Sequence, residues 1–278
     1  MTSRTIGNVL MNGASTDPLS ASVSIFDVGF QRGYGCFEAM RSYEGHVFRL
    51  DAHLARLERS ADHLRIQLVS RDLLSEWCTE VATGGDGVLR VYVTGGMDAS
   101  APGIDNLTAV YLEALPDIST TVRLDLLEAP WHADGRVSEL TGAKTLSYGP
   151  NLAATIEAKS KGFDDAVLFG SSGMVLEGPT FSIGWVVDGA VCTPGLDSQI
   201  LASITREATI EAAEEIGLTV SIDRYPIKAL LEADEVFLMS TVREVMPVTA
   251  VGSVEFLPGP VTVKLHSAFQ RLVARDAV

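Results

Sequence analysis

The sequence lacks the features typical of disulfide-rich, metal-binding and membrane-spanning proteins, because it has few cysteines and no long apolar segment. Its 278 residues include three cysteines, Cys36, Cys78 and Cys192, whose wide spacing predicts neither a disulfide framework nor a CxxC metal or redox pair. It has no apolar segment long enough to span a bilayer, and no basic N-terminal start followed by an apolar run. These absences predict a reduced, soluble, cytoplasmic protein, and no metal site is expected.

Positive charge is scarce as well. The 21 lysine and arginine residues are outnumbered by 36 aspartate and glutamate residues, which gives a formal net charge of −15 at pH 7. Nucleic acid and anionic membrane surfaces are therefore poor partner candidates. The glycines of residues 29–35 are not in the GxGxxG order and no P-loop lysine follows them, so the sequence predicts no nucleotide-binding loop of either kind.

Apolar residues, in contrast, make up 46% of the chain, which is enough for one large domain or two moderate ones. Residues 116–121 (PDISTT) are mostly proline and polar residues between two patterned regions, and they are expected to form a linker. We therefore expect a small N-terminal α+β domain over residues 1–115 and a larger C-terminal domain over residues 122–278.

The N-terminal part combines strand and helix periodicity. A hairpin is expected with its turn at residues 44–45, and strand alternation places Phe37, Ala39 and Arg41 on one of its faces. Asp51 is expected to cap the helix that follows. The elements expected in this part are the hairpin 36–50, helices 51–64 and 70–83, and strands 89–94 and 108–115.

The C-terminal part shows the same mixture. Ser203 begins a helix with apolar residues at spacing four, and its capped N-terminus would offer the amides of Ile204 and Thr205 to an anion. Ser240 and Thr241 follow a buried strand and place two hydroxyls at its end. The elements expected here are strands 122–127, 166–169, 183–187, 190–193, 219–222 and 235–239, and helices 151–161, 204–216, 228–232 and 261–274.

Lys144 stands out because it follows the uncharged segment 140–143 (LTGA) and precedes an alanine-rich helical segment. Desolvation disfavours the charged form of a lysine, and a neutral amine is a nucleophile able to form a Schiff base. On these residues alone, a surface lysine at a helix entrance is the favoured interpretation.

Four fragments in order resemble the fold-type IV family of pyridoxal 5'-phosphate (PLP) enzymes, also called class IV aminotransferases. They are the Phe37-Glu38 hairpin with residues 53–57, then Lys144, then Glu177-Gly178, and then residues 204–206 with Ser240-Thr241. The resemblance runs from about residue 27 to residue 251. It implies a two-domain α+β fold, with a small N-terminal α/β sandwich and a larger C-terminal pseudo-barrel that close around PLP, and it implies a homodimer.

The resemblance also implies catalytic roles. Lys144 would form the Schiff base with PLP and then move a proton between the substrate carbon and C4′ of the cofactor. Glu177 would keep the pyridine nitrogen protonated, which makes the ring an electron sink. Without the resemblance, Glu177 reads as a solvent-facing glutamate at a strand end, followed by a glycine.

Further cofactor contacts follow from the same resemblance. The phosphate would be held by Arg56, by the Ile204 and Thr205 amides behind Ser203, and by the Thr241 hydroxyl beside Ser240. Tyr148 would lie near the phenolic oxygen of PLP. Helical periodicity alone places Arg56 at the edge of the apolar stripe, as a solvated or rim arginine, and Tyr148 reads equally well as a packed tyrosine.

The chain departs from the family where the substrate would bind. Ser182 stands near the position of an asparagine in many members, and residues 97–106 contain no arginine, lysine or histidine to trap a carboxylate. Arg41 or Arg243 would supply a replacement cation, although each also reads as a surface ion-pair partner. The expected substrate pocket comprises Phe37, Ala39, Arg41, Gly95, Val242 and Arg243.

Three functions remain open on these grounds. The first is a PLP-dependent aminotransferase that moves an amino group from an amine or amino acid to a keto acid, with D-amino acid or (R)-amine donors favoured over branched-chain L-amino acids. The second is a 4-amino-4-deoxychorismate lyase that releases pyruvate. The third is a binding protein of this fold without turnover, which the presence of Lys144, Glu177 and the phosphate set disfavours.

Overall fold

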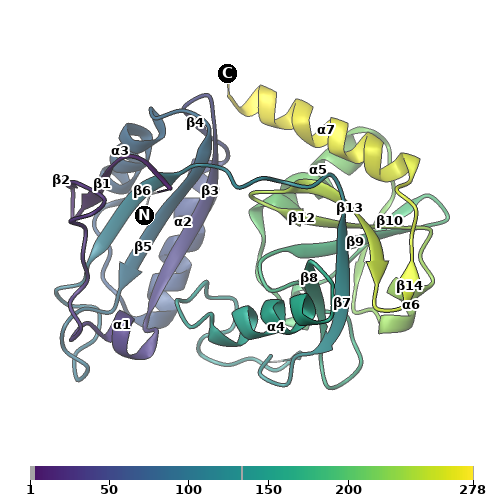
Figure 1. Ribbon diagram of the computed structural model, residues 1–278, viewed down its shortest axis with the longest axis horizontal. Helices are drawn as coiled ribbons and strands as arrows, with labels where there is room; N and C mark the ends of the chain where they lie inside the picture. The colour runs from purple at the N-terminus through teal and green to yellow at the C-terminus, as the bar shows by residue number, and fades with distance from the viewer. Residues whose placement is uncertain (1–3, 133, 278) are drawn as a thin grey trace. The chain divides into compact units, whose positions relative to one another are not determined.

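The computed structural model describes residues 4–132 and 134–277. The chain divides into two compact units (Figure 1). Unit 1 contains the described residues up to Asp117, the segment Ala143–Tyr148 and the chain from Asp276, whereas unit 2 contains Ile118–Gly142 and Gly149–Arg275. The segment that carries Lys144 therefore packs with unit 1, although its neighbours in sequence on both sides belong to unit 2.

Unit 1 is one antiparallel sheet covered by helices. Its strand order is β2-β1-β6-β5-β3-β4. Figure 1 shows α2 behind β5 and β3. The strands are β1 (Thr5–Met11), β2 (Ala14–Thr16), β3 (Gly35–Tyr43), β4 (His46–Val47), β5 (Gly87–Thr94) and β6 (Thr108–Glu113), and the helices are α1 (Val28–Arg32), α2 (Leu50–Leu64) and α3 (Arg71–Ala82).

The predicted hairpin and helices of unit 1 are present. Residues 44–45 turn the chain between β3 and β4, where both have positive φ. The apolar stripe of α2, made of Leu54, Leu57, Ala61 and Leu64, is buried in the core. On β3 the alternation is as expected, because Glu38, Met40 and Ser42 are fully buried while Ala39 and Arg41 on the opposite face are partly exposed.

The predicted cap of α2 is wrong. The helix begins at Leu50, directly after Arg49 in the left-handed conformation (φ 54°), and Asp51 lies in its first turn. An acidic residue in the first turn still interacts favourably with the positive end of the helix dipole. By contrast, α3 begins as expected, with the Ser70 hydroxyl accepting from the Leu73 amide.

Unit 2 is built on an eight-stranded mixed sheet with the order β11-β10-β9-β12-β13-β7-β8, and β14 pairs with β13. The pairs β10–β11, β13–β7 and β7–β8 are parallel. Its strands are β7 (Val122–Glu128), β8 (Asp165–Phe169), β9 (Ser182–Val187), β10 (Ala190–Pro194), β11 (Val220–Asp223), β12 (Glu235–Ser240), β13 (Glu244–Val251) and β14 (Val254–Glu255).

The helices of unit 2 pack on this sheet. Contacts join α4 to β8 and β7, and α5 to β12 and β11. The helices are α4 (Gly149–Ser160), the 3-10 turn η1 (Leu196–Ser198), α5 (Ile204–Glu215), α6 (Ile227–Leu231) and α7 (Pro260–Asp276). The Asp188-Gly189 turn joins β9 to β10, with φ of 50° and 78° as a tight hairpin requires. Two sheets with helices packed on them confirm the α+β class.

Among the helices in the described part of the chain, none is both long and apolar enough to cross a membrane.

Candidate functional site

The segment with Lys144 is held against the start of β3 by its backbone. The Phe37 amide donates to the Lys144 carbonyl at 3.0 Å, and the Leu146 amide donates to the Gly35 carbonyl at 2.8 Å. A side chain at Gly35 would collide with Leu146 and with the Val93 carbonyl on β5. The segment therefore lies along β3 because residue 35 is a glycine.

The amine of Lys144 lies among aromatic rings. Its Nζ donates a hydrogen bond to the Tyr148 hydroxyl at 3.2 Å and lies 4.2 Å from the centre of the Phe37 ring. The rings of Phe37 and Tyr148 meet edge to face at 5.1 Å, and Phe37 stacks on Tyr92 at 5.4 Å. Lys144 is thus a partly buried lysine with a fixed amine position, not a freely solvated one.

Arg56 is buried on α2, only 4% exposed, so the interpretation of a solvated or rim arginine is wrong. Its Nε and Nη2 donate to Oε1 and Oε2 of Glu38, each at 2.7 Å, and His53 Nδ1 lies 2.8 Å from Glu38 Oε2. Periodicity places Arg56 at the edge of the apolar stripe, but its side chain pairs with the Glu38 carboxylate on β3 and is buried there. A buried arginine is stable in such a place because it is paired.

The same contacts set the ionisation of this cluster. Burial alone would raise the pKa of the Glu38 carboxyl, but the charge and hydrogen bonds of Arg56, with those of His53, lower that pKa to about 2. Burial lowers the pKa of His53, against the opposing effect of Glu38. At neutral pH, Glu38 is therefore ionised beside the Arg56 guanidinium.

The other predicted pocket residues of unit 1 follow β3 and β5. Phe37, Ala39 and Arg41 share one face of β3, and Arg41 lies four residues beyond Phe37, roughly 13 Å at the usual strand rise. In the described part of the chain, Arg41 Nε is buried and makes no hydrogen bond. Gly95 follows β5 at the Phe37 end, tightly packed against Val28 and Tyr34.

In unit 2, Glu177 lies after the turn that follows β8, where its carbonyl accepts from the Leu168 amide of β8 at 2.9 Å. Its Oε1 accepts from the Leu201 amide at 3.1 Å and lies 3.9 Å from His132 Nε2. Leu201 is two residues before Ser203, so the carboxylate is tied to the segment that leads into α5. Glu177 is partly buried by these contacts and does not point freely into solvent.

The helix that follows has the predicted cap. Ser203 Oγ accepts from the Arg206 amide at 3.2 Å, and both Ile204 and Thr205 are buried. Arg206 in the same turn is buried as well, with Nε donating to Thr193 and Nη2 to the Pro194 carbonyl. Burial lowers the pKa of Arg206, and the charge of Glu177 opposes that shift.

The remaining predicted site residues of unit 2 lie at or beside the C-terminal end of β12. Ser182 pairs in register with Met239, the residue before Ser240, and the Ser240 hydroxyl accepts from the Arg243 amide at 3.0 Å. Thr241 and Val242 lie in the turn that leads to β13. Arg243 lies 3.7 Å from Asp165 Oδ2 and 5.9 Å from the Phe181 ring centre, so the ion-pair interpretation holds for Arg243.

Four polar residues near these groups had no predicted role. On unit 1, Glu38 and His53 belong to the fragments that carry the family resemblance but have no role of their own in the prediction, and Ser60 is in none of those fragments. On unit 2, Arg206 was likewise only part of a fragment. The available signal for Arg56 and its partners was an arginine at the edge of the apolar stripe of α2, because a charged side chain that is buried there requires a counter-charge.

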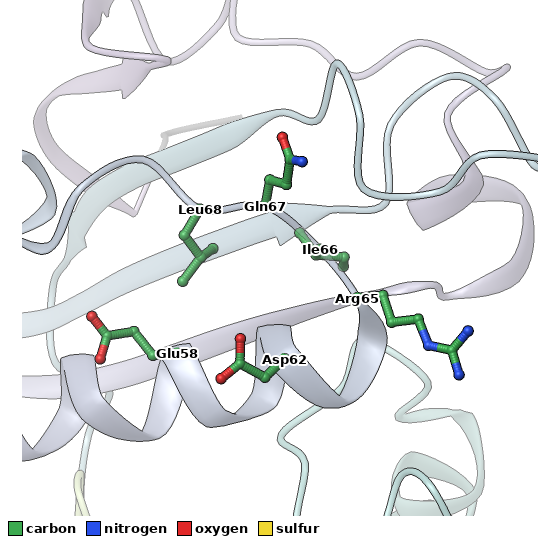
Figure 2. A pocket seen from close by; sticks show the side chains of 6 residues that line it. All are labelled: Glu58, Asp62, Arg65, Ile66, Gln67 and Leu68. Atoms are coloured by element: carbon green, nitrogen blue, oxygen red, sulfur yellow. The ribbon is translucent and has the colours of Figure 1, made fainter.

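The pocket in Figure 2 is elsewhere on unit 1 and encloses about 510 Å³. It lies beside the C-terminal half of α2 and the residues after it, and it is lined by Glu58, Asp62, Arg65, Ile66, Gln67 and Leu68. None of the predicted site residues lines it. Over the described residues, no group of three or more histidine, cysteine, aspartate or glutamate side chains could hold a metal ion.

Comparison with known protein families identifies the family of this chain. Residues 35–251 match the family described as amino-transferase class IV, which is well over half of the chain. The chain belongs to the class IV aminotransferase family. It is therefore a PLP-dependent enzyme of the transaminase type, with the fold of type IV transaminases.

Individual relatives spread over several activities. A putative branched-chain-amino-acid aminotransferase from Methanocaldococcus jannaschii is 31% identical over 86% of each chain. An aminodeoxychorismate lyase from Bacillus subtilis is 29% identical over 96% of this chain and 94% of the relative. Among solved structures, a fold IV transaminase from Curtobacterium pusillum is 30% identical, covers 94% of this chain and 92% of its own, and has a TM-score of 0.85.

The residues present in this class IV aminotransferase fit PLP chemically. The fixed amine of Lys144 suits a carbonyl, and the capped start of α5 offers backbone amides to a phosphate. Within the described residues, Ser182 Oγ is buried and has no hydrogen-bond partner, as expected of a group whose partner is a ligand.

Proposed function

We propose that the protein is an aminotransferase that moves an amino group from an amine or amino acid to a keto acid, with D-amino acid or (R)-amine donors favoured. The observation that carries the proposal is the Lys144 amine, fixed between the Tyr148 hydroxyl and the Phe37 ring. Membership of the family supports the reaction class, and the individual relatives do not agree on one substrate.

In this proposal, Lys144 attaches the cofactor through Nζ and is then the base and acid at the substrate carbon. When bound, PLP supplies the electron sink that makes that carbon acidic. The Tyr148 hydroxyl accepts from Nζ and so aims the amine, while the Phe37 ring beneath it limits access of water. Proton transfer by a group held in this way is the usual source of rate in such a step.

The remaining residues hold the cofactor. Glu177 would face the pyridine nitrogen with its carboxylate steadied by the Leu201 amide. Arg56, the amides of Ile204 and Thr205 behind Ser203, and Thr241 beside Ser240 would bind the phosphate, where charge and a helix N-terminus act together. Ser182 would direct its buried hydroxyl to the cofactor, in place of the asparagine of related enzymes.

For the substrate, we propose Phe37, Ala39, Gly95, Val242, Arg41 and Arg243 as pocket residues. The cation-free loop over residues 97–106 removes one usual anchor for a carboxylate. Both arginines have a buried nitrogen without a hydrogen-bond partner among the described residues, Nε in Arg41 and Nη1 in Arg243. Arg41 is the better replacement, since Nη1 of Arg243 lies 3.7 Å from the Asp165 carboxylate, which offsets its charge.

A screen of half-reactions tests this function. Cofactor absorbance is followed as the purified protein is offered D-alanine, L-branched amino acids, L-glutamate and (R)-1-phenylethylamine separately. Conversion of the cofactor to its amine form by D-alanine or by the (R)-amine is expected. Release of pyruvate from aminodeoxychorismate without an amino acceptor would favour the lyase instead, and conversion by L-branched amino acids alone would make it a branched-chain enzyme.

The same screen separates the two arginines. If α-amino acids react, Arg41→Ala should raise their KM more than Arg243→Ala does, and should leave the KM of the (R)-amine unchanged. Equal effects of the two substitutions would contradict the assignment of Arg41. A homodimer and a cytoplasmic location belong to this proposal as well, and the dimer is considered in the Discussion.

A further inference from the structure

Four polar side chains lie buried between α2 and β3, in the middle of an apolar core. Glu38, His53, Arg56 and Ser60 are each at most 4% exposed, and they are surrounded by residues such as Leu54 and Leu57. Apolar residues in their place would pack this interface without the cost of desolvating charges. Retention of a complete polar cluster at this place points to a role beyond packing.

The first part of the cluster fixes the direction of the Arg56 guanidinium. A bidentate contact from Nε and Nη2 to the two oxygens of Glu38 holds the plane of the group, because both bonds must be kept at once. His53 holds the same carboxylate from another side, with Nδ1 2.8 Å from Oε2. Without Glu38, the long arginine side chain would have many rotamers and no fixed plane.

The second part of the cluster reaches the Lys144 backbone. Ser60, one helical turn after Arg56, donates from Oγ to the Arg56 carbonyl at 2.9 Å and accepts from the Lys144 amide at 3.0 Å. The Lys144 carbonyl accepts from Phe37, the neighbour of Glu38. Both polar groups of the residue 144 backbone are thus held by elements that also carry the Glu38–Arg56 pair.

We propose that Glu38 and Ser60 are positioning residues with two separable tasks: Glu38 orients Arg56 for the phosphate of the cofactor, and Ser60 sets the backbone from which Lys144 reaches the carbonyl of the cofactor. This inference rests on the proposed function, since it takes Arg56 as a phosphate ligand and Lys144 as the attachment point. It adds two residues that touch neither cofactor nor substrate.

The test compares two ligands that differ only in the phosphate. The affinities of the apoprotein for PLP and for pyridoxal are measured by absorbance titration, in wild-type protein and in Glu38→Gln and Ser60→Ala. Glu38→Gln should weaken PLP about ten- to a hundredfold, the range for loss of a residue that orients a ligand group, and should change pyridoxal affinity less than about threefold. Ser60→Ala should weaken both ligands by the same factor.

Two controls match these changes. Glu58→Gln alters a partly exposed glutamate on the same helix, whose partner is Arg71 and not a residue of the cluster. Ser267→Ala removes a hydroxyl that donates to the carbonyl four residues before it, as Ser60 does, but on α7. Both controls should bind both ligands as wild type does. The ratio of PLP affinity to pyridoxal affinity does not depend on the fraction of folded protein. Glu38→Asp, which keeps the charge, should lower this ratio less than Glu38→Gln does.

Equal loss of PLP and pyridoxal affinity in Glu38→Gln, or no loss of either, would overturn the role of Glu38, because a merely structural residue has no preference between the two ligands. For Ser60→Ala the apoprotein is also followed by thermal unfolding, and it should melt close to wild type while both affinities fall. Unchanged affinities, or a fall in affinity explained by the fraction of unfolded apoprotein, would overturn the role of Ser60. If Glu38→Gln fails to fold, the same criterion applies to Glu38→Asp. Failure of wild-type protein to bind PLP would instead refute the proposed function itself.

Discussion

At the scale of single residues, the surroundings of Lys144 and Glu38 differ in kind. The Lys144 amine donates to the Tyr148 hydroxyl, lies against aromatic rings and belongs to a partly buried side chain. The Glu38 carboxylate is fully buried and is held by the Arg56 guanidinium and by His53. The first environment suits a group that reacts, and the second suits a group that fixes the position of others.

Tyr148 offers a direct test of the first environment. Tyr148→Phe keeps the ring that packs against Phe37 but removes the oxygen that accepts from Lys144 Nζ. We expect kcat to fall about tenfold or more, because without this hydrogen bond the Lys144 amine is no longer held in position for proton transfer. The free energy of unfolding should change little. Steady-state kinetics with thermal unfolding measure both, and an unchanged kcat would show that the hydroxyl does not position the lysine.

The second environment predicts a dependence of stability on pH. The pKa of Glu38 is lowered from 4.5 to about 2, so its ionised form stabilises the fold fully above pH 4.5, and this contribution is lost as pH falls from 4.5 towards 2. The lost free energy of unfolding is on the order of 3 kcal/mol for such a shift. The lowered pKa of His53 acts in the same direction, since its unfolded form gains a proton below about pH 6.5.

Urea unfolding of wild type at pH 7, 5, 4 and 3 measures this loss. Glu38→Gln should be less stable at pH 7, because it leaves Arg56 buried without a counter-charge, and should lose less stability between pH 5 and 3. Glu80→Gln, an exposed glutamate of α3, is the control and should follow wild type. Parallel curves for wild type and Glu38→Gln would contradict the assigned pKa.

At the scale of elements, the segment Ala143–Tyr148 is placed by β3 and α2 rather than by its own secondary structure. Gly35 permits this approach, since a Cβ there would meet both Leu146 and the Val93 carbonyl. The backbone pairs of Phe37 with Lys144 and of Gly35 with Leu146 then set the register of the lysine. The position of Lys144 therefore depends on a residue more than a hundred positions earlier in the chain.

Gly35→Ala should displace this segment. We expect it to cost about 1–3 kcal/mol of stability, as overpacking does, and to reduce attachment of the cofactor. Gly149→Ala, just after the same segment, is the matched control, because its φ is not positive and its Cβ would meet nothing within 4 Å. Cofactor absorbance and thermal unfolding of both variants measure the difference, and full cofactor attachment in Gly35→Ala would contradict the argument.

The strongly periodic elements were predictable from the sequence. Helices α2, α3 and α5 each bury a stripe at helical spacing, and the turns at residues 44–45 and 188–189 each end in a glycine with positive φ. Strand β1 was not predicted, since its register shifts between Ile6 and Leu10 and this breaks the alternation. Strand β13 was missed too, and Pro247 within it opposes a strand interpretation.

The site was predictable in its residue types but not in its contacts. Lys144, Glu177 and Arg56 were found through a family resemblance, which carries chemistry but no distances. The pair of Arg56 with Glu38 depends on how α2 lies over β3, and the hydrogen bond from the Lys144 amide to Ser60 joins residues 84 positions apart. Such long-range contacts leave no local pattern in the sequence.

At the scale of the whole molecule, unit 1 exposes large apolar side chains close together in sequence. Ile25 and Phe26 are each 64% exposed and Phe30 is 69% exposed. Exposed apolar residues that are grouped in this way are typical of a surface that another chain covers. They support the proposed homodimer.

Sedimentation equilibrium tests the dimer. We expect wild type to sediment at twice the mass of the chain, and Phe30→Asp to shift the equilibrium towards the monomer by at least tenfold in Kd, since a charge would be buried in an apolar contact. An exposed polar residue on the same short helix, Arg32, supplies the control as Arg32→Gln. A wild-type monomer at every concentration would contradict the expectation.

The central claim is that Lys144 carries the cofactor, and borohydride reduction tests it most directly. Reduction of the PLP-loaded protein followed by peptide mapping should find one phosphopyridoxyl group, on Lys144, and none in Lys144→Ala, which should also lose turnover. Labelling of a different lysine, or a Lys144→Ala variant with undiminished turnover, would contradict the account.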